Sequence, residues 1–312
     1  MEYIWFVEFS FAADGQLLQC RVAPRFPAQG QSITDNVLCP LSNIDSCDTL
    51  ADLLDTAPSP GFQLLSRYVD TLASLHSLPF TALQLIADDG TVMDLSQVQI
   101  LAQGQHSMVL LPSPASNFVI KISLSSLIDH ERRIHSLVDG TSNHLRRMAA
   151  GSSSYGKVNG VGDGLAFLKL EGVGNPFIAS DAASDAAFVS LWEHARDGLA
   201  GMHARRILHR DVKPSNMIII HGSLLLNDFD VSCSLDDTPA VLQQLQVGTD
   251  SYRSPKLKDK WRERDDWLGL VLSFLSLRMP FPFKNKQATL EHALHLSWVP
   301  STMKECIQRC YV

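Results

Sequence analysis

The chain has 312 residues, of which 45% are hydrophobic and 19% are charged, and its formal net charge is −7. This composition predicts a folded protein with a substantial core and excludes an intrinsically disordered chain. The acidic balance argues against general binding to nucleic acids or to anionic membranes. The length allows one large domain and a smaller additional one.

The cysteines show no CxxC spacing and no histidine-rich metal pattern. Cys306 and Cys310 are four residues apart and would share a helix face, but two ligands do not make a zinc site. A reduced protein in the cytoplasm or another intracellular compartment is therefore expected. The acidic N-terminus has no basic segment typical of a secretory signal. The six cysteines are Cys20, Cys39, Cys47, Cys233, Cys306 and Cys310.

The first 95 residues mix strand and helix patterns. Tyr3–Phe9 and Leu17–Val22 flank an Asp-Gly turn and predict a β-hairpin. A passage rich in Pro and Ser follows, then a predicted helix over Phe62–Leu75 and a second hairpin around residues 88–90. We recognise no family in this region.

The next elements carry an unusual pair of charges. Lys121 lies in the apolar strand Phe118–Ile122, where an unpaired ammonium would be costly. The following segment, residues 126–138, has helical periodicity with Glu131 inside its apolar stripe, and Gly140 ends it. Glu131 is therefore predicted to point inward and to partner Lys121, although a solvent-exposed position is the alternative.

A strand and a long helix follow. Residues 165–174 read as a strand that runs into a glycine-containing segment, with a plain edge strand and loop as the alternative. Residues 183–205 form a helix whose apolar stripe is expected to be core. This stripe consists of Phe188, Leu191, Trp192, Ala195, Leu199 and Met202.

The segment Leu208–Asn216, LHRDVKPSN, places an Asp, a Lys and an Asn at a spacing that suits phosphoryl transfer from ATP. Such a reaction needs the acceptor hydroxyl, the phosphate and Mg²⁺ to be positioned together. Asp211 would accept the hydroxyl proton, Lys213 would lie by the transferred phosphate, and Asn216 would bind the metal. A polar turn is the alternative for this segment in isolation.

The segments that follow decide between these readings. Two apolar runs around His221 and Gly222 predict a hairpin that delivers Asp228 to the same place. The segment 247–256, VGTDSYRSPK, and a helix over 266–277 come next. That helix is apolar on nearly every face, which predicts burial, and it is too short to span a membrane.

In this order the segments resemble the eukaryotic-type protein kinase superfamily from about residue 96 to the end, and Lys213 resembles the serine/threonine kinases. Small-molecule kinases usually lack this Lys and the GTxxYxSP pattern. The resemblance implies an α+β bilobal fold with a β-rich smaller lobe, a catalytic domain over 96–312, and ATP and Mg²⁺ as cofactors. Residues 1–95 would form an accessory module that docks a partner, regulates the smaller lobe or, the favoured option, braces it.

The resemblance also implies residue roles. Gly104 would cover the phosphates, Lys121 and Glu131 would pair there, and backbone groups of residues 171–173 would contact the adenine ring. Asp266 would anchor the catalytic loop, and Thr249 would contact it. The implied nucleotide-binding residues are Leu101, Gly104, Val109, Lys121, Glu131, Glu171 and Val173, and the metal ligands are Asn216 and Asp228.

Several positions depart from the kinase pattern. Ala102 and Ser107 replace two glycines of the phosphate loop, Lys256 replaces a glutamate, and Asp230 stands where glycine is expected. Asp tolerates positive φ at some cost, so a conformational effect is expected there, with an additional carboxylate near the metal ions as the alternative. Candidate phosphorylation sites, with Arg210 as the receiver, are Ser232, Ser234, Thr238, Thr249, Ser251 and Tyr252.

The expected function is ATP-dependent phosphoryl transfer to serine or threonine hydroxyls of protein substrates. The alternative is a pseudokinase, an ATP-binding or non-catalytic scaffold that regulates a partner protein. The intact Lys and Asp residues favour activity.

Overall fold

The structure is a computed structural model and describes residues 5–11, 17–24, 84–103, 107–159, 164–236, 248–253, 261–283 and 285–310. Within this part of the chain the helices are α3 (Ser125–Val138), α4 (Asp185–Ala204), α6 (Glu263–Leu275), α7 (Lys286–Ala293) and α8 (Ser301–Cys310). None of them is both long enough and apolar enough to cross a membrane.

The strands of the described residues form four sheets. β1 (Trp5–Phe11) pairs with β2 (Leu17–Pro24), and β10 (Ile207–Leu208) pairs with β13 (Cys233–Ser234). A three-stranded sheet has the order β12-β11-β9, from Ser223–Leu226, Met217–Ile220 and Asn175–Pro176. A six-stranded sheet has the order β3-β7-β8-β6-β5-β4, with bounds Gln84–Ala87, Tyr155–Asn159, Leu165–Glu171, Phe118–Leu124, Ser107–Leu111 and Gln99–Gln103.

The chain divides into two compact units. The first comprises Met1–Ser113, Lys121–Ile128 and Tyr155–Phe167, and the second comprises the remaining segments. In the first unit, β1 and β2 pair antiparallel with Val7 opposite Val22, which confirms the predicted N-terminal hairpin. The predicted helix over Phe62–Leu75 lies outside the described residues.

The first unit also contains the strands expected to bind the nucleotide. β4 and β5 are antiparallel, and Ala102 pairs with Val109, so Leu101 and Val109 are close neighbours across the ladder. Leu101 is 45% exposed, whereas Lys121 in β6 is 5% exposed. The prediction that Lys121 lies in a buried strand is confirmed, and Gly104 lies outside the described residues.

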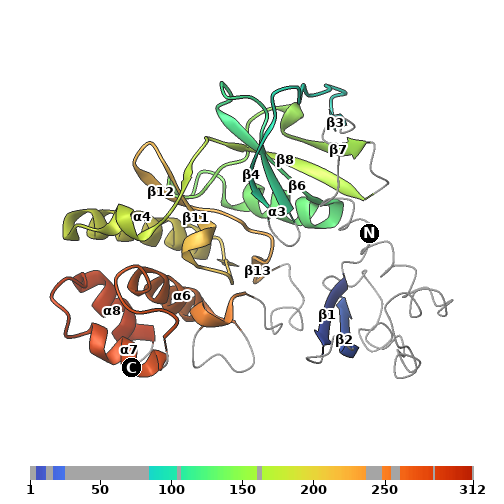
Figure 1. Cartoon of the computed structure of the whole chain (residues 1–312). Coiled ribbons are helices and arrows are strands. Elements are labelled where there is room, and N and C mark those ends of the chain that lie inside the picture. The colour runs from blue at the N-terminus through green and yellow to red at the C-terminus, as the bar shows by residue number, and fades with distance from the viewer. Residues whose placement is uncertain are drawn as a thin grey trace. The chain divides into compact units, whose positions relative to one another are not determined.

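The core of the second unit is built around α4 and α6, which Figure 1 shows gathered with α7 and α8. The predicted stripe of α4 is buried throughout, and α6 is buried on nearly every face, as its sequence predicts. The rings of Phe188 and Trp192 from α4 each meet Phe274 of α6 edge-on, with centroids 5.4 Å apart. Val271 is fully buried in this core.

Two predicted elements of the second unit are confirmed in detail. Glu131 is 1% exposed on α3, while Arg132 and Arg133 face away from the core, and Gly140 at φ 71° follows the helix end. β11 and β12 form the predicted hairpin, with Ile220 opposite Ser223 and positive φ at both turn residues, His221 and Gly222. That geometry belongs to a tight two-residue turn.

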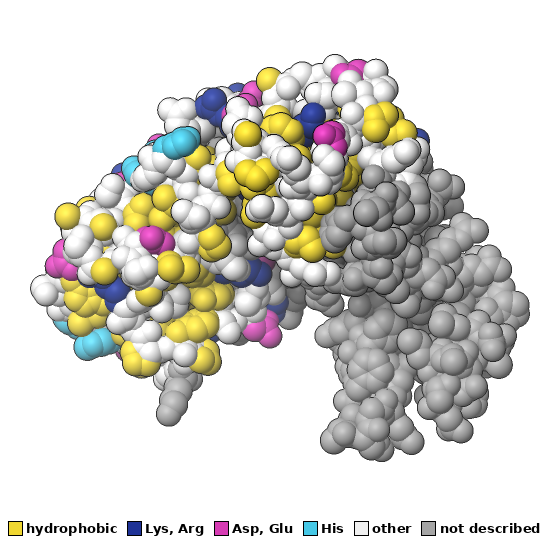
Figure 2. All heavy atoms as spheres, turned by 45° about the horizontal axis from the view of Figure 1, so that its top comes forward, with side chains coloured by type: hydrophobic (Ala, Val, Ile, Leu, Met, Phe, Trp, Pro, Cys, Tyr) yellow, Lys and Arg dark blue, Asp and Glu magenta, His cyan; other side chains and the backbone are white. Residues whose placement is uncertain are grey.

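Charged side chains are dispersed over the surface that Figure 2 shows. On that face, the Lys, Arg, Asp and Glu side chains of the described residues are scattered among hydrophobic and uncharged ones, and in places they lie next to one another. A continuous basic stripe, the usual electrostatic footprint of a nucleic-acid-binding protein, is not present among the described residues of this face.

Candidate functional site

One buried carboxylate, that of Asp266, accepts hydrogen bonds from the backbone of the loop Leu208–Asn216. Asp266, 1% exposed in the first turn of α6, accepts hydrogen bonds from the backbone N–H groups of His209 and Arg210, each at 2.8 Å. His203 Nε2 lies 3.0 Å from the same carboxylate. The core helix therefore fixes the loop backbone, as the kinase resemblance implied for Asp266.

Replacing Asp266 with asparagine should lower the free energy of unfolding by about 3 kcal/mol, because an amide N–H₂ would face buried N–H donors. The measurement is denaturant unfolding of the variant beside Asp250→Asn, whose side chain is 88% exposed and whose change should have little effect. Equal stability of the two variants would contradict the anchoring role of Asp266.

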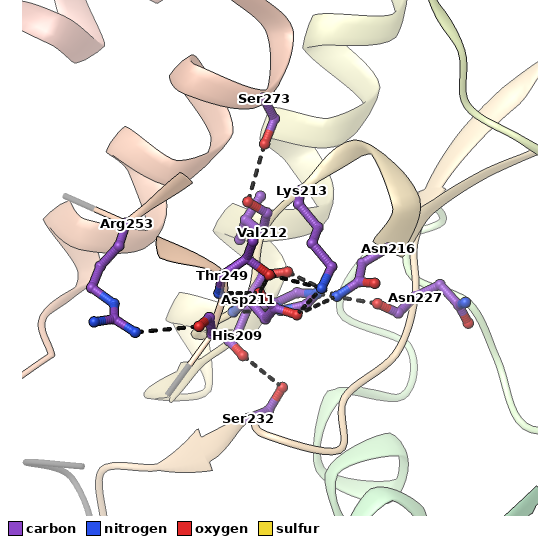
Figure 3. Close-up of polar contacts among 11 residues, drawn as sticks. His209, Asp211, Val212, Lys213, Asn216, Asn227, Ser232, Thr249, Arg253 and Ser273 are labelled. Carbon is purple, nitrogen blue, oxygen red and sulfur yellow. Dashed lines mark hydrogen bonds and ion pairs between the residues drawn. The ribbon is translucent and has the colours of Figure 1, made fainter. Parts of the chain in front are cut away.

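Asp211 lies at the centre of a polar cluster within this loop, which Figure 3 shows. Its Oδ1 accepts from the Thr249 backbone N–H at 2.8 Å and from the Thr249 hydroxyl at 2.9 Å. Its Oδ2 accepts from Asn216 Nδ2 at 2.9 Å and lies 2.7 Å from Lys213 Nζ. Lys213 also donates to the Thr249 hydroxyl at 2.9 Å. The structure thus brings Asp211, Lys213 and Asn216 together.

Gly248 makes the approach of Thr249 possible. It has φ 83°, and a Cβ placed on it would lie 2.2 Å from the carbonyl oxygen of Arg210. Only glycine combines this backbone angle with such a close contact. The GT pair of the sequence is therefore explained by geometry: glycine allows the approach and threonine makes the hydrogen bonds.

The two candidate metal ligands lie on joined segments. The backbone N–H of Asn227 donates to the carbonyl oxygen of Asn216 at 2.9 Å. Asp228 is the residue after Asn227, so this hydrogen bond places its backbone close to the loop Leu208–Asn216. Because the Asn216 amide nitrogen donates to Asp211, its oxygen is the atom that would bind a metal ion. Asp228 has φ 66°.

This donor set fits Mg²⁺ when phosphate completes the coordination. The described residues contain no group of three or more His, Cys, Asp or Glu side chains that could hold a metal ion. Mg²⁺ usually binds through one or two carboxylates together with substrate phosphates and water, and it prefers oxygen donors. Asn216 and Asp228 supply that kind of ligand.

A column of rings links α3 to the segment after Asp228. Phe229, fully buried, lies between His135 of α3 at 4.8 Å and His209 of the loop at 5.6 Å between ring centroids. The Phe229 N–H donates to Glu131 Oε1 at 3.4 Å. Glu131 therefore contacts the residue that follows Asp228, a contact that its position in the helical stripe did not reveal.

The end of β8 is held by a buried arginine that the sequence analysis missed. Arg146, 5% exposed, donates from Nε to the carbonyl oxygen of Glu171 at 3.3 Å and from Nη2 to that of Gly172 at 2.7 Å. Burial lowers the pKa of Arg146 to about 10, and the negative charge of Glu131 opposes this change. An arginine in a charged stretch carries no sequence signal of burial, so this residue could not be found from the pattern.

Two histidines hold the strand that leads to Asp228. His144 and His194 stack with centroids 4.2 Å apart. Since the Leu224 carbonyl oxygen can only accept, His144 Nδ1 donates to it, at 3.2 Å, and the Leu224 N–H donates to His194 Nδ1 at 3.3 Å. Burial, followed by the neighbouring His144, lowers the pKa of His194, while Asp197 opposes the shift.

This arrangement should make stability depend on pH. A folded-state pKa below the ordinary value of 6.5 stabilises the protein above pH 6.5, and the contribution is lost as the pH falls through the lowered pKa. The thermal midpoint should therefore fall less between pH 7.5 and pH 5 in His194→Gln than in the wild type. His295→Gln, at an exposed position, is the control and should keep the wild-type slope. Parallel curves for His194→Gln and the wild type would contradict the proposed coupling.

Two expectations about the residues that follow Asp228 need correction. Asp230 is not among the described non-glycine residues with positive φ, so the expected conformational strain does not arise there and the positive φ falls on Asp228 instead. Ser232 and Ser234 are 2% and 5% exposed, and Ser232 donates to the His209 carbonyl oxygen. Phosphorylation of either would require this segment to open, and Arg210, the expected receiver, is itself buried. Thr238 and Lys256 lie outside the described residues.

Comparison with known proteins agrees with this geometry. Residues 173–308 match the family model described as protein kinase domain. The chain is 30% identical over 122 residues to mouse "Dual specificity protein kinase TTK", covering 34% of this chain and 14% of the relative. It is 36% identical over 115 residues to "Mitogen-activated protein kinase kinase 2" of Arabidopsis thaliana, covering 35% and 31%.

Residues 173–308 are therefore similar to a protein kinase domain, and the curated relatives that match this chain are protein kinases. The part that matches the kinase family contains the catalytic loop, Asp228 and the whole of α6, in a kinase-like α+β fold. A third relative, "Probable serine/threonine-protein kinase mps1" of Dictyostelium discoideum, is 34% identical over 109 residues, which are 30% of this chain and 11% of the relative. The matches thus span between 11% and 31% of the length of these three kinases.

Proposed function

We propose that the chain transfers the γ-phosphoryl group of ATP to serine or threonine hydroxyls of a protein substrate. The observation that carries this proposal is the cluster around Asp211, in which a carboxylate, an ammonium and an amide are fixed within hydrogen-bond distance of one another. Because phosphoryl transfer needs little covalent work from the protein, positioning of this kind supplies most of the catalysis.

Each residue of the cluster has a distinct role in the proposal. Asp211 orients the acceptor hydroxyl and takes its proton, while Lys213 neutralises charge on the transferred phosphate. Thr249 holds the carboxylate from the side opposite Asn216. Asn216 and Asp228 would hold Mg²⁺, which neutralises charge on the phosphate oxygens when bound.

The same proposal includes further contacts with the nucleotide. Lys121 would pair with the phosphates and with Glu131, and the burial of both side chains, 5% and 1% exposed, supports a need for charged partners. Leu101 and Val109 would cover the base from neighbouring strands, with Gly104 between them. Val173 follows the strand end held by Arg146 and would offer its backbone to the base.

The scaffold function is the second candidate. The two oxygens of Asp211 already receive four contacts, two from Thr249 and one each from Lys213 and Asn216. A carboxylate has about four acceptor sites, so an incoming hydroxyl must displace one of these donors. A chain that binds ATP without transferring it would keep this cluster closed.

The activity test separates the two candidates. Purified chain is incubated with Mg²⁺, ATP labelled on the γ-phosphate and a generic basic protein, and the labelled amino acids are identified. Label on serine or threonine, lost when Mg²⁺ is chelated, supports the kinase. Label on tyrosine as well would indicate the dual specificity that the name of the mouse relative states. A thermal shift with Mg-ATP but no transfer favours the scaffold, and no shift at all contradicts both the kinase and an ATP-binding scaffold.

We also propose that residues 1–95 form an accessory module of a catalytic domain of residues 96–312, although β3 of that module is hydrogen-bonded to β7 in the six-stranded sheet. The paired strands β1 and β2 support a folded element within the module. Bracing of the small lobe, docking of a protein partner and regulation remain its candidate roles.

A further inference from the structure

The backbone of Glu171 and Gly172 is fully used within the protein. Both carbonyl oxygens accept from the guanidinium of Arg146, at 3.3 and 2.7 Å. The N–H of Glu171 donates to the carbonyl oxygen of Arg147 at 2.9 Å, and the N–H of Gly172 donates to that of Asn117 at 2.8 Å. All four polar groups that precede Val173 are therefore engaged before a nucleotide arrives.

Arg146 is held so that it cannot easily release these carbonyls. Its side chain is 5% exposed, and its own N–H donates to the carbonyl oxygen of Leu226 at 2.9 Å, beside the parallel pairing of Leu145 with Leu226. A hydrogen bond from a charged donor is shorter and stronger than one from a neutral donor, and removing Arg146 would leave two acceptors without their partner.

Gly172 fixes the direction of the second carbonyl. It has φ 74°, and a Cβ there would lie 2.6 Å from Cδ1 of Ile220, so the segment is packed tightly against β11. In contrast, no described residue forms a hydrogen bond with the backbone of Val173, which is 39% exposed. Val173 is the first position of this segment whose backbone is open to a ligand.

Adenine and guanine differ in the hydrogen-bonding groups that they present to a protein backbone. Adenine presents an amino donor at C6, whereas guanine presents an acceptor oxygen at the same place. A carbonyl acceptor beside a backbone N–H therefore selects adenine. An N–H alone can pair with the ring nitrogen of adenine or with the oxygen of guanine. A carbonyl that already accepts from a guanidinium is a poorer acceptor for a second donor, because the positive charge draws electron density away from the remaining lone pair.

We propose that Arg146 sets nucleotide specificity by withdrawing the carbonyls of Glu171 and Gly172 from base recognition, so that the site accepts GTP as well as ATP. The inference rests on the proposed function, because it assumes that Val173 faces the base. Arg146 acts through the backbone and does not touch the nucleotide, so it is a positioning residue.

The first test needs only the wild-type protein. ATP and GTP, each with Mg²⁺, compete against a fluorescent ATP analogue, a readout that requires no catalysis. The apparent affinity for GTP is expected to lie within about tenfold of that for ATP, since one neutral hydrogen bond is worth about that factor. ATP competition without any GTP competition at millimolar concentration overturns the inference but leaves the proposed function standing. Failure of both nucleotides overturns both.

The second test changes Arg146. In Arg146→Met the Glu171 carbonyl regains its acceptor role, so the preference for ATP over GTP should rise about tenfold. Arg146→Lys, which keeps a positive charge, should fall between the two. Arg147→Met is the matched control, because Arg147 is exposed and its side chain bonds Asn143. It should keep the wild-type ratio.

A purely structural role for Arg146 predicts a different result. Loosening of the segment would weaken both nucleotides equally and leave their ratio unchanged in Arg146→Met, which would overturn the proposal. If Arg146→Met does not fold, the wild-type ratio and Arg146→Lys still decide the question.

Discussion

Asp211→Asn is expected to lower kcat for phosphoryl transfer by about 10²- to 10⁴-fold while the affinity for Mg-ATP changes little. An amide cannot take the proton of the acceptor hydroxyl. Its nitrogen would also face donors, because Oδ2 now receives contacts from Lys213 and Asn216 at 2.7 and 2.9 Å. The loss should therefore combine chemistry with a disturbed loop.

Single-turnover transfer from labelled ATP measures the chemical step, and a thermal-shift titration measures binding. Asp236→Asn is the control, because that side chain is 58% exposed and pairs with Arg206, which precedes the loop. Transfer by Asp211→Asn within threefold of the wild type would remove Asp211 from the mechanism. A small loss in kcat with a large loss in affinity would assign it to binding instead.

Gly248→Ala is expected to lower kcat/KM by about 10²-fold, because a misplacement of about 1 Å in a catalytic group has that effect. The new methyl group would lie 2.2 Å from the carbonyl oxygen of Arg210, so the backbone must move. Thr249 would move with it and withdraw two hydrogen bonds from Asp211.

Gly222→Ala is a closely matched control. Gly222 has φ 81° against 83° for Gly248, but a Cβ at Gly222 would meet no heavy atom within 4 Å. Both variants therefore bear the same backbone strain, of about 1–2 kcal/mol, and only Gly248→Ala adds the collision. Comparison of kcat/KM and of unfolding free energy separates the two effects. Equal kinetics in the two variants would show that the approach of Thr249 is unimportant.

Local patterns predicted most of the elements that build the site. The stripe of α4, the apolar faces of α6 and the turn between β11 and β12 are all confirmed. These features depend on residues a few positions apart, whose relation is set by the helical or strand repeat. The position of Asn216 beside Asp211 is similarly local, since five residues separate them.

The contacts that make the loop a site join residues far apart in the sequence. Thr249 and Asp211 are 38 residues apart, and His209 and Asp266 are 57 apart. The kinase resemblance implied both partners, but periodicity alone could not. The expected strain at Asp230 was wrong, because the backbone takes its left-handed turn at Asp228.

The sequence by itself therefore determined the helices, the hairpins and the order of the phosphoryl-transfer motifs, because each of these depends on residues that are only a few positions apart. Only the tertiary structure decided that Arg146 is buried against two backbone carbonyls and that Glu131 meets the Phe229 N–H. A charged side chain has the same pattern on a surface as in a core. A charged side chain can be buried only where tertiary packing brings hydrogen-bond or ion-pair partners from distant parts of the sequence close to it.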